Sequence, residues 1–300
     1  MQLHQGGLFS FLGFSGLRGI VPLLIYERKS KYFLQTPTDL RLLFVYFYRM
    51  NQKSLFIGQN RIELDKIDST NNYASDLLSK KRPIEGTVIL AHEQTAGKGQ
   101  RGSTWETKAG LNLTVSIILY PRQELKKQFF LNEVVSLALC DYVITELGEQ
   151  VKIKWPNDIF FKDKKIAGVL IENSVKGSVI DSSVIGIGLN VNQTAFGNYP
   201  LQASSLKAIS GKEYLLQNCL DAFCSFLEAR YLQLKAGNEK IVQEDYHKAL
   251  YRLGEFHNYI VDEKNILAKI TGVSEEGKLL IETDQKEKYI FDNKEIRFVI

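Results

Sequence analysis

From residue 61 onward, the chain alternates short runs of β-forming residues with stretches whose apolar residues have helical spacing. Residues 62–66 predict a strand, and Asp68-Ser69-Thr70 follows it with side-chain oxygens that can cap a helix over about 70–79. Further strands are predicted at 86–92, 111–119, 151–154, 165–172 and 179–191, and further helices at 129–147, 213–235 and 238–251. Strands and helices mixed in this way predict an α+β domain, which we place at residues 55–252.

The C-terminal region has a different pattern, with five short β-runs from His257 onward. Gly272, Gly277 and the pair Asp292-Asn293 separate these runs, as turn residues do. Short strands at this spacing predict a small β-barrel over residues 253–300.

Residues 1–49 differ from everything after them. Glycines interrupt an apolar, aromatic-rich stretch there, and Arg18 lies in its middle. A secretory signal would begin with a cationic region, and a spanning helix would need about 20 apolar residues without a central charge. The only methionines are Met1 and Met50. We therefore expect Met50 to be the natural start and residues 1–49 to lie outside the native fold; the alternative is a membrane anchor.

The net charge of +4 comes entirely from the first 49 residues, which hold six basic and two acidic side chains. Residues 50–300 carry 32 basic and 32 acidic side chains. Such a neutral body argues against a protein that binds duplex DNA, although it leaves room for a local basic patch. The three cysteines form neither an even disulfide framework nor a CxxC pair, which favours a reducing cytoplasm.

A glycine-rich loop spans Gly97-Lys98-Gly99-Gln100-Arg101-Gly102-Ser103-Thr104-Trp105. Its spaced glycines let backbone N–H groups turn toward an anion, and Lys98 and Arg101 add positive charge. Trp105 could stack on a base or cover a ligand. Taken alone, the loop is equally well explained as a solvated turn, and it lacks the GxxxxGK[ST] pattern of a Walker loop.

The stretch Lys154-Trp155-Pro156-Asn157-Asp158 follows a predicted strand. Lys154 can meet a phosphate as a point charge, and Asn157 and Asp158 offer oxygens to a metal ion. A Pro-Asn-Asp turn would explain the last three residues equally well, but not the Lys-Trp pair before them.

Two further candidate stretches, 164–172 and 186–192, lie on predicted strands. Lysines are normally surface residues, so an exposed position is favoured for Lys164 or Lys165 taken alone. The glycine spacing of the second stretch lets backbone approach a ligand, and Asn190 could recognise an adenine edge. A β-bulge with a polar exit is the alternative.

In order and spacing these stretches, with Asp68-Ser69-Thr70-Asn71 ahead of them, resemble the GRGRRGxxW, KWPND, KKxxGxLxE and GxGxNxN motifs of biotin–protein ligases. The resemblance covers most of residues 60–300. It implies the class II synthetase-like biotin/lipoate ligase fold, with a mixed, mainly antiparallel sheet flanked by helices and an SH3-like C-terminal barrel. Only about ten residues separate Met50 from the first predicted strand, so the short form without an N-terminal DNA-binding domain is expected.

The resemblance also implies a two-step reaction. Biotin and ATP, with Mg²⁺, form biotinyl-5′-AMP, and biotin then passes to a lysine of a biotin carboxyl carrier domain. We expect a cytoplasmic ligase, a monomer or weak homodimer, with no nucleic-acid or membrane partner.

Site residues follow from the resemblance by position. The ureido head of biotin would be held by Ser69, Thr70 and Gln94, and Lys165 would contact the reacting carboxylate and the α-phosphate. Asn157 or Asp158 would serve the Mg²⁺ that accompanies ATP, and Trp105 would help to cover the adenylate. The full set implied is Lys98, Arg101, Lys154 and Lys165 for catalysis, Ser69, Thr70, Asn71, Gln94, Lys98, Gly99, Gln100, Lys165 and Gly168 for biotin, and Arg101, Trp105, Lys154, Asn157 and Asn190 for ATP or the adenylate.

The loop departs from the family pattern at two positions that are commonly arginine. Lys98 keeps the charge but loses the bidentate fork, and Gln100 loses the charge, which predicts a looser hold on the adenylate.

Three other functions remain open. A lipoate–protein ligase or octanoyltransferase would resemble the same fold, but the loop ending at Trp105 and the KWPND stretch favour biotin. A non-catalytic biotin sensor would not need the cluster of cations, and a DNA-binding regulator is disfavoured by the neutral body.

Overall fold

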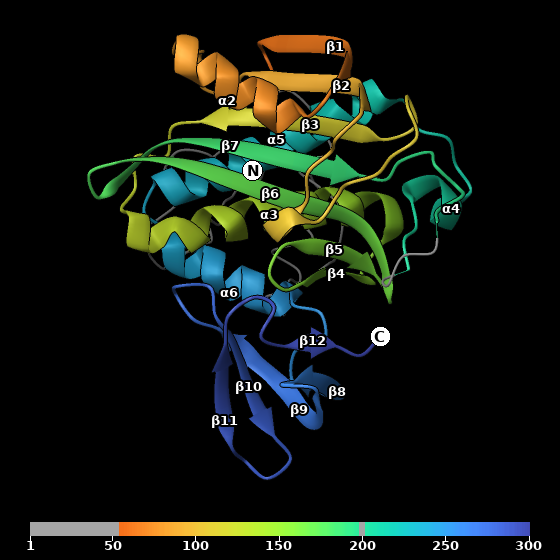
Figure 1. Ribbon diagram of the computed structural model, residues 1–300, viewed down its shortest axis with the longest axis vertical. Helices are drawn as coiled ribbons and strands as arrows, with labels where there is room; N and C mark the ends of the chain where they lie inside the picture. The colour runs from red at the N-terminus through yellow and green to blue at the C-terminus, as the bar shows by residue number, and fades with distance from the viewer. Residues whose placement is uncertain (1–53, 198–201) are drawn as a thin grey trace, which may run out of the picture. The chain divides into compact units, whose positions relative to one another are not determined.

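The predicted strands assemble into two separate sheets in the computed structural model, which describes residues 54–197 and 202–300 (Figure 1). The prediction about residues 1–49 and Met50 therefore lies outside the described residues. The first sheet has seven strands in the order β1-β2-β3-β7-β6-β5-β4, and only the β1–β2 pair is parallel. Its strands are β1 (Arg61–Ile67), β2 (Val88–Gln94), β3 (Leu113–Leu119), β4 (Val151–Lys154), β5 (Asp158–Phe161), β6 (Lys164–Lys176) and β7 (Val179–Leu189).

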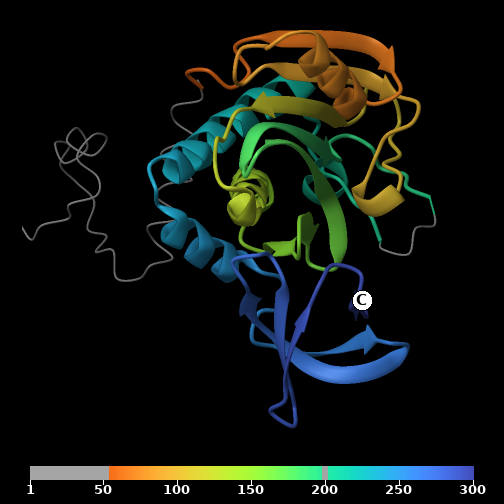
Figure 2. The same cartoon turned by 60° about the vertical axis from the view of Figure 1, so that its left-hand side comes forward.

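Helices cover both faces of this sheet, which confirms the predicted α+β class with a mixed, mainly antiparallel sheet. The described helices are α2 (Thr70–Lys80), α3 (Gln128–Leu147), α4 (Leu206–Ser210), α5 (Leu216–Lys235) and α6 (Glu239–Ala249), with short 3₁₀ turns η1 (Gln100–Gly102) and η2 (Leu125–Lys127). The sheet curves around α3, whose middle turns are fully buried (Figure 2). None of the described helices is long and apolar enough to cross a membrane.

Strand register divides the first sheet into a core face and a second face that carries the site. Side chains from Leu113, Val115, Ile117 and their partners on β7 and β6 belong to the main hydrophobic core with α3 and α5. The alternate residues point the other way, because successive side chains of a strand lie on opposite faces. There Ile118 and Val184 pack against Ala74 of α2 in a smaller apolar cluster.

The C-terminal strands form an antiparallel sheet in the order β11-β10-β9-β8-β12, which is consistent with the predicted small SH3-like barrel. Its strands are β8 (Phe256–Val261), β9 (Lys264–Val273), β10 (Leu279–Thr283), β11 (Lys288–Phe291) and β12 (Arg297–Phe298). The Trp155 indole N–H donates to the carbonyl oxygen of Gly277 at 2.9 Å, which ties this sheet to the turn between β4 and β5. Cys140, Cys219 and Cys224 are all buried in the described part of the chain.

Three local predictions need correction. The strand β5 and the short helix α4 were missed, because runs of four and five residues are too short to show a period. Ser69 occupies the N-cap position of α2, but its side chain makes no capping hydrogen bond. Instead, Gln94 from β2 reaches across, and its Oε1 accepts from the Thr70 N–H at 2.8 Å.

A buried carboxyl in α3 makes the stability of the fold depend on pH. Glu133 is 1% exposed, and neither carboxyl oxygen has a hydrogen-bond partner among the described residues. Burial raises the pKa of Glu133 to about 8. The folded chain therefore keeps a proton that the unfolded chain has already lost, so stability is highest at acidic pH and falls as pH rises toward the raised pKa.

We expect Glu133→Gln to remove this dependence. The variant should gain stability relative to the parent by roughly 3 kcal/mol between about pH 5 and about pH 8, since a tenfold change in proton affinity corresponds to about 1.4 kcal/mol. Denaturant unfolding at both pH values measures the gain, with Glu149→Gln, at an exposed position just after α3, as the matched control. A gain that did not change with pH would contradict the assignment.

Candidate functional site

A cavity of about 720 Å³ lies where the glycine-rich loop, the second face of the first sheet and the C-terminal sheet meet. The register of three neighbouring strands builds its floor. Gly188 of β7 pairs with Thr114 of β3 on one side and with Gly168 of β6 on the other, and Gly186 is in register with Ser116. Without side chains at these positions, groups from other elements can lie directly against the backbone of the sheet.

The glycine-rich loop is a closed hairpin that delivers Trp105 to this floor. The Trp105 N–H donates to Gly97 O at 2.9 Å, and the Gly99 N–H donates to Ser103 O at 2.7 Å. A Cβ atom at Gly188 would overlap the Trp105 indole, so the ring can lie on β7 only because residue 188 is glycine. The indole N–H is buried and has no acceptor among the described residues.

One end of the cavity is lined by neutral hydrogen-bonding groups. Thr70 Oγ1 lies 3.0 Å from Gln94 Oε1 and 2.8 Å from Ser116 Oγ. Ser116 Oγ also lies 2.6 Å from Asn71 Oδ1, and the Asn71 amide donates to Glu172 at 2.7 Å. These contacts link α2, β2, β3 and β6 and suit a neutral ligand that both donates and accepts hydrogen bonds.

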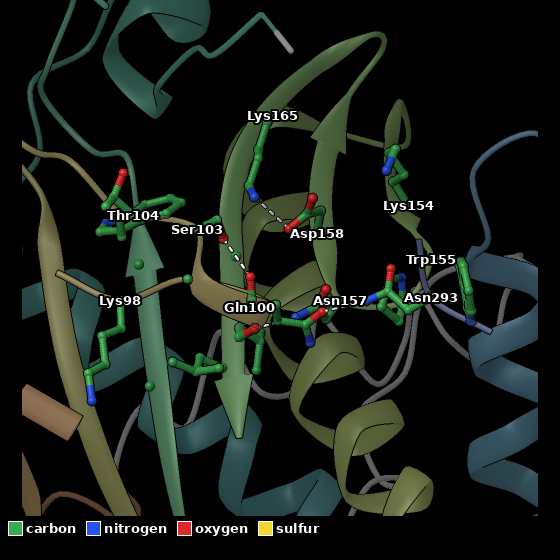
Figure 3. Close-up of a pocket in the computed structure, with 18 of the residues that line it drawn as sticks. Lys98, Gln100, Ser103, Thr104, Lys154, Trp155, Asn157, Asp158, Lys165 and Asn293 are labelled. Atoms are coloured by element: carbon green, nitrogen blue, oxygen red, sulfur yellow. Dashed lines mark hydrogen bonds and ion pairs between the residues drawn. The ribbon is translucent and has the colours of Figure 1, made fainter. Parts of the chain in front are cut away.

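The other end is cationic. Figure 3 shows Lys165 and Asp158 facing one another, and their Nζ and Oδ1 atoms are 2.6 Å apart. The Lys154 ammonium lies 4.5 Å from the centre of the Phe298 ring. Burial lowers the pKa of Lys154, and the nearby Lys165 charge lowers it further, whereas Asp158 raises it.

The turn that positions Lys154 is held from behind by two helices. Asn132 of α3 and Tyr246 of α6 each donate to the Pro156 carbonyl at 2.8 Å, and the Trp155–Pro156 peptide bond is cis. The Asn157 amide donates to Val169 O on β6. Because these bonds use the core elements, the turn is a rigid support for the cationic end.

The C-terminal sheet supplies part of the wall, which sequence reasoning missed. Asn293 donates to Gln100 Oε1 at 2.8 Å, so the tip of the glycine-rich loop bonds to the second sheet. Ile260, Lys294 and residues 296–300 also line the cavity. No motif marks them, and only the fold brings them to the site. Ser116 was likewise given no role, because a serine in an apolar strand carries no signal of its own. Glu172 is the last residue of the KKxxGxLxE motif, but nothing in the sequence assigned it a role.

Most of the predicted site residues do meet in this cavity. The lining contains Ser69, Thr70, Asn71, Gln94, Lys98, Gly99, Gln100, Trp105, Lys154, Asn157, Asp158, Lys165 and Gly168. The Lys98 side chain turns away from Lys165 and Lys154 (Figure 3), and its ammonium bonds to Asn72 of α2. Arg101 lies in η1, and its side chain is outside what the structure describes.

Asn190 is the exception, since the structure does not bring it to the cavity. Its side chain is buried, and its amide donates to the carbonyl oxygen of Ser204, just before α4, at 3.0 Å. The geometry gives this side chain a structural bond in place of the predicted contact with adenine.

Comparison with known proteins identifies the family. Residues 63–190 match the model of the biotin/lipoate A/B protein ligase family. The bifunctional ligase/repressor BirA of Bacillus spizizenii is 31% identical over 249 residues, which are 81% of this chain and 75% of that protein. This chain is a member of the biotin–protein ligase family. A biotin–[acetyl-CoA-carboxylase] ligase of Paracoccus denitrificans is 35% identical over 43% of this chain and 53% of its own length.

Solved structures of the family share the fold. The biotin protein ligase of Aquifex aeolicus in complex with biotin and ATP has a TM-score of 0.67 and 27% identity, and the match covers 80% of this chain and all of that one. This confirms the predicted biotin ligase fold with its C-terminal β-unit.

The packing of Trp105 on Gly188 in this ligase can be tested by adding one methyl group at position 188. Gly188→Ala should push the Trp105 indole off the sheet, because the two groups cannot occupy the same space. The tryptophan emission should shift to longer wavelength and become easier to quench with acrylamide, while far-ultraviolet circular dichroism stays unchanged. The only other tryptophan, Trp155, is 3% exposed and reports little of this change. An unchanged emission spectrum would contradict the packing of Trp105 on Gly188.

Proposed function

We propose that this protein converts biotin and ATP into biotinyl-5′-AMP and transfers the biotin to a lysine of a biotin carboxyl carrier domain. One observation carries the proposal: a single cavity has a neutral hydrogen-bonding end and a cationic end, joined by a glycine floor. Biotin has the matching parts, namely a ureido ring, an apolar bicycle and chain, and a terminal carboxylate.

Biotin binding uses the whole length of the cavity. The ureido head lies against Thr70 and Gln94, and the apolar part crosses the glycine floor beside the Trp105 ring. The carboxylate then points toward Lys165, which already holds an anionic partner in Asp158. A cation that is paired before the substrate arrives costs less to bury than a bare one.

Adenylate formation needs the approach of two anions. A carboxylate oxygen of biotin attacks the α-phosphorus of ATP, a new P–O bond forms, and the bond to the pyrophosphate leaving group breaks. Lys165 and Lys154 place positive charge beside the phosphorus and the leaving oxygens, where negative charge accumulates. The half-buried environment makes this stabilisation stronger than it would be in water.

Magnesium fits this site as a companion of ATP. Among the described residues that line the cavity, Asp158 has the only acidic side chain. No cluster of three or more acidic, histidine or cysteine residues in the described part of the chain could hold a metal alone. Mg²⁺ commonly takes one or two carboxylates together with phosphate oxygens and water. Asp158, with the Asn157 carbonyl nearby in sequence, would hold the ion, which supplies charge neutralisation of the phosphates.

Transfer requires a dry adenylate and access for an amine. The acceptor lysine attacks the acyl carbon of biotinyl-AMP, an amide bond forms, and AMP leaves with the anhydride oxygen. The glycine-rich loop, held to the C-terminal sheet through Gln100 and Asn293, limits the entry of water. We expect the enzyme to act in the cytoplasm as a monomer or weak homodimer, and the neutral charge of residues 50–300 argues against a nucleic-acid partner.

Lipoate or octanoate is the substrate class to exclude. Neither carries a ureido group, and both would leave the polar contacts of Thr70, Gln94 and Asn71 facing apolar atoms. Pyrophosphate release from ATP with biotin, lipoate or octanoate, followed by labelling of a carrier domain, tests this. The proposal expects activity with biotin alone; activity with lipoate alone would place the chain among the lipoate ligases, and biotin binding without pyrophosphate release would make it a sensor.

Replacing Lys165 should stop the first step. Lys165→Ala is expected to lower the rate of biotin-dependent pyrophosphate release by about 100-fold or more, because the charge next to the reacting carboxylate is lost. The neighbouring Lys164→Ala is the matched control, since Lys164 is exposed and does not line the cavity. Equal rates for the two variants would refute the assigned role of Lys165.

The lowered pKa of Lys154 predicts a pH effect on nucleotide binding. Since the ammonium loses its proton at lower pH than an ordinary lysine, the KM for ATP should begin to rise at a pH where an ordinary lysine is still fully protonated. Lys154→Arg should flatten this rise, because a guanidinium stays protonated. Lys152→Arg, on the same strand but outside the cavity lining, should keep the parent's pH profile. A KM for ATP that rises equally in Lys154→Arg would contradict the prediction.

A further inference from the structure

A chain of hydrogen bonds runs from the neutral end of the cavity to a glutamate outside it. It passes from Gln94 through Thr70, Ser116 and Asn71 to Glu172. Ser116 is completely buried and Asn71 is 3% exposed, whereas Glu172 is exposed and lines a neighbouring cavity beside α2. The direction in which protons point along this chain decides what the cavity offers to a ligand.

Both ends of the chain are fixed. Gln94 must present its oxygen to Thr70, because the Thr70 backbone N–H donates to that atom at 2.8 Å. At the other end the Glu172 carboxylate can accept a hydrogen bond but has none to donate, so the Asn71 NH₂ group must face it. Asn71 therefore turns its carbonyl oxygen toward Ser116, into space left by the absent side chain at Gly186.

Between these two ends, the hydroxyl protons are too few to give every contact a hydrogen bond. The Thr70 and Ser116 hydroxyls make three contacts, to Gln94, to each other and to Asn71, and have one proton each. Each hydroxyl can donate to either of its two neighbours, and we assign the two protons to the two shorter contacts: Ser116 donates to Asn71 Oδ1 at 2.6 Å, and Thr70 donates to Ser116 Oγ at 2.8 Å. The contact of 3.0 Å between Thr70 Oγ1 and Gln94 Oε1 is left without a hydroxyl proton.

We propose that Glu172 is a positioning residue that sets this direction, so that Thr70 Oγ1 and Gln94 Oε1 together accept one N–H of the ligand. Two neighbouring acceptors without a shared proton favour a ligand that brings a donor. A ureido N–H supplies that proton, whereas a ligand with a carbonyl or ether oxygen at the same place adds a third acceptor. The inference rests on the proposed function. It assigns to Glu172 the preference of the neutral end for a ligand with a hydrogen-bond donor.

Variants at position 172 should weaken biotin binding in a defined order. Glu172→Gln can turn either group toward Asn71 and should lose part of the affinity. Glu172→Ala leaves the Asn71 amide free to turn over, and should raise the Kd for biotin about tenfold, the loss of one buried hydrogen bond. Glu172→Lys donates to Asn71, reverses the chain, and should be at least as damaging as alanine.

Simple electrostatics predicts the opposite result for lysine, since added positive charge would favour an anionic ligand. Neither the KM for ATP at saturating biotin nor kcat should change by more than about twofold in these variants, because the cationic end is untouched. Asp181→Ala is the matched control: Asp181 lines the same neighbouring cavity and bonds to Arg82, not to Asn71.

Breaking the chain of hydrogen bonds at Ser116 tests whether Glu172 acts on biotin binding through this chain. Ser116→Ala removes the link between Asn71 and Thr70, so adding Glu172→Ala to it should raise the Kd no further than Ser116→Ala alone. Isothermal titration of the full chain with biotin, together with biotin-dependent ATP–pyrophosphate exchange, gives all of these values. Additive losses in the double variant, or Glu172→Lys binding biotin better than Glu172→Ala, would overturn the inference. If the unmodified chain did not bind biotin, the proposed function would fail and this inference with it.

Discussion

Gly186 and Gly188 lie near the C-terminal end of β7, in register with Ser116 and Thr114 on one side and with Leu170 and Gly168 on the other. A side chain at either glycine would occupy the space that Asn71 or Trp105 now fills. The rest of the site depends on this constraint. The bare floor lets the glycine-rich loop close with Trp105 against the sheet, and it places the neutral and cationic ends of one cavity on the same face.

The two ends owe their character to different parts of the chain. The neutral end is built where α2 begins, and Gln94 both satisfies the first backbone N–H of that helix and lines the cavity. The cationic end is built on a turn that α3 and α6 hold rigidly and that the C-terminal sheet covers with Phe298. A small second sheet therefore completes a site whose motifs all lie in the larger domain.

Sequence reasoning reached most of the fold, because long strands and helices with a clear period, such as β7 and α3, carry their own signal. It missed β5 and α4, which are too short for a period, and it placed Asn190 in the site although that side chain bonds to Ser204 O. The motifs located Lys165 and Thr70 and contained Glu172 without indicating its role, whereas Ser116 and Asn293 lie outside them. Their roles arise from strand register and from contacts between segments distant in sequence.

The most direct test of one cavity with two chemically distinct ends is a crystal structure of the protein with a non-hydrolysable analogue of biotinyl-AMP. We expect a ureido N–H within hydrogen-bonding distance of both Thr70 Oγ1 and Gln94 Oε1, the linker between biotin and AMP crossing Gly188 beside Trp105, and the phosphate next to Lys165 and Lys154. An analogue bound in the reverse direction, or with its ureido ring away from α2, would contradict this arrangement.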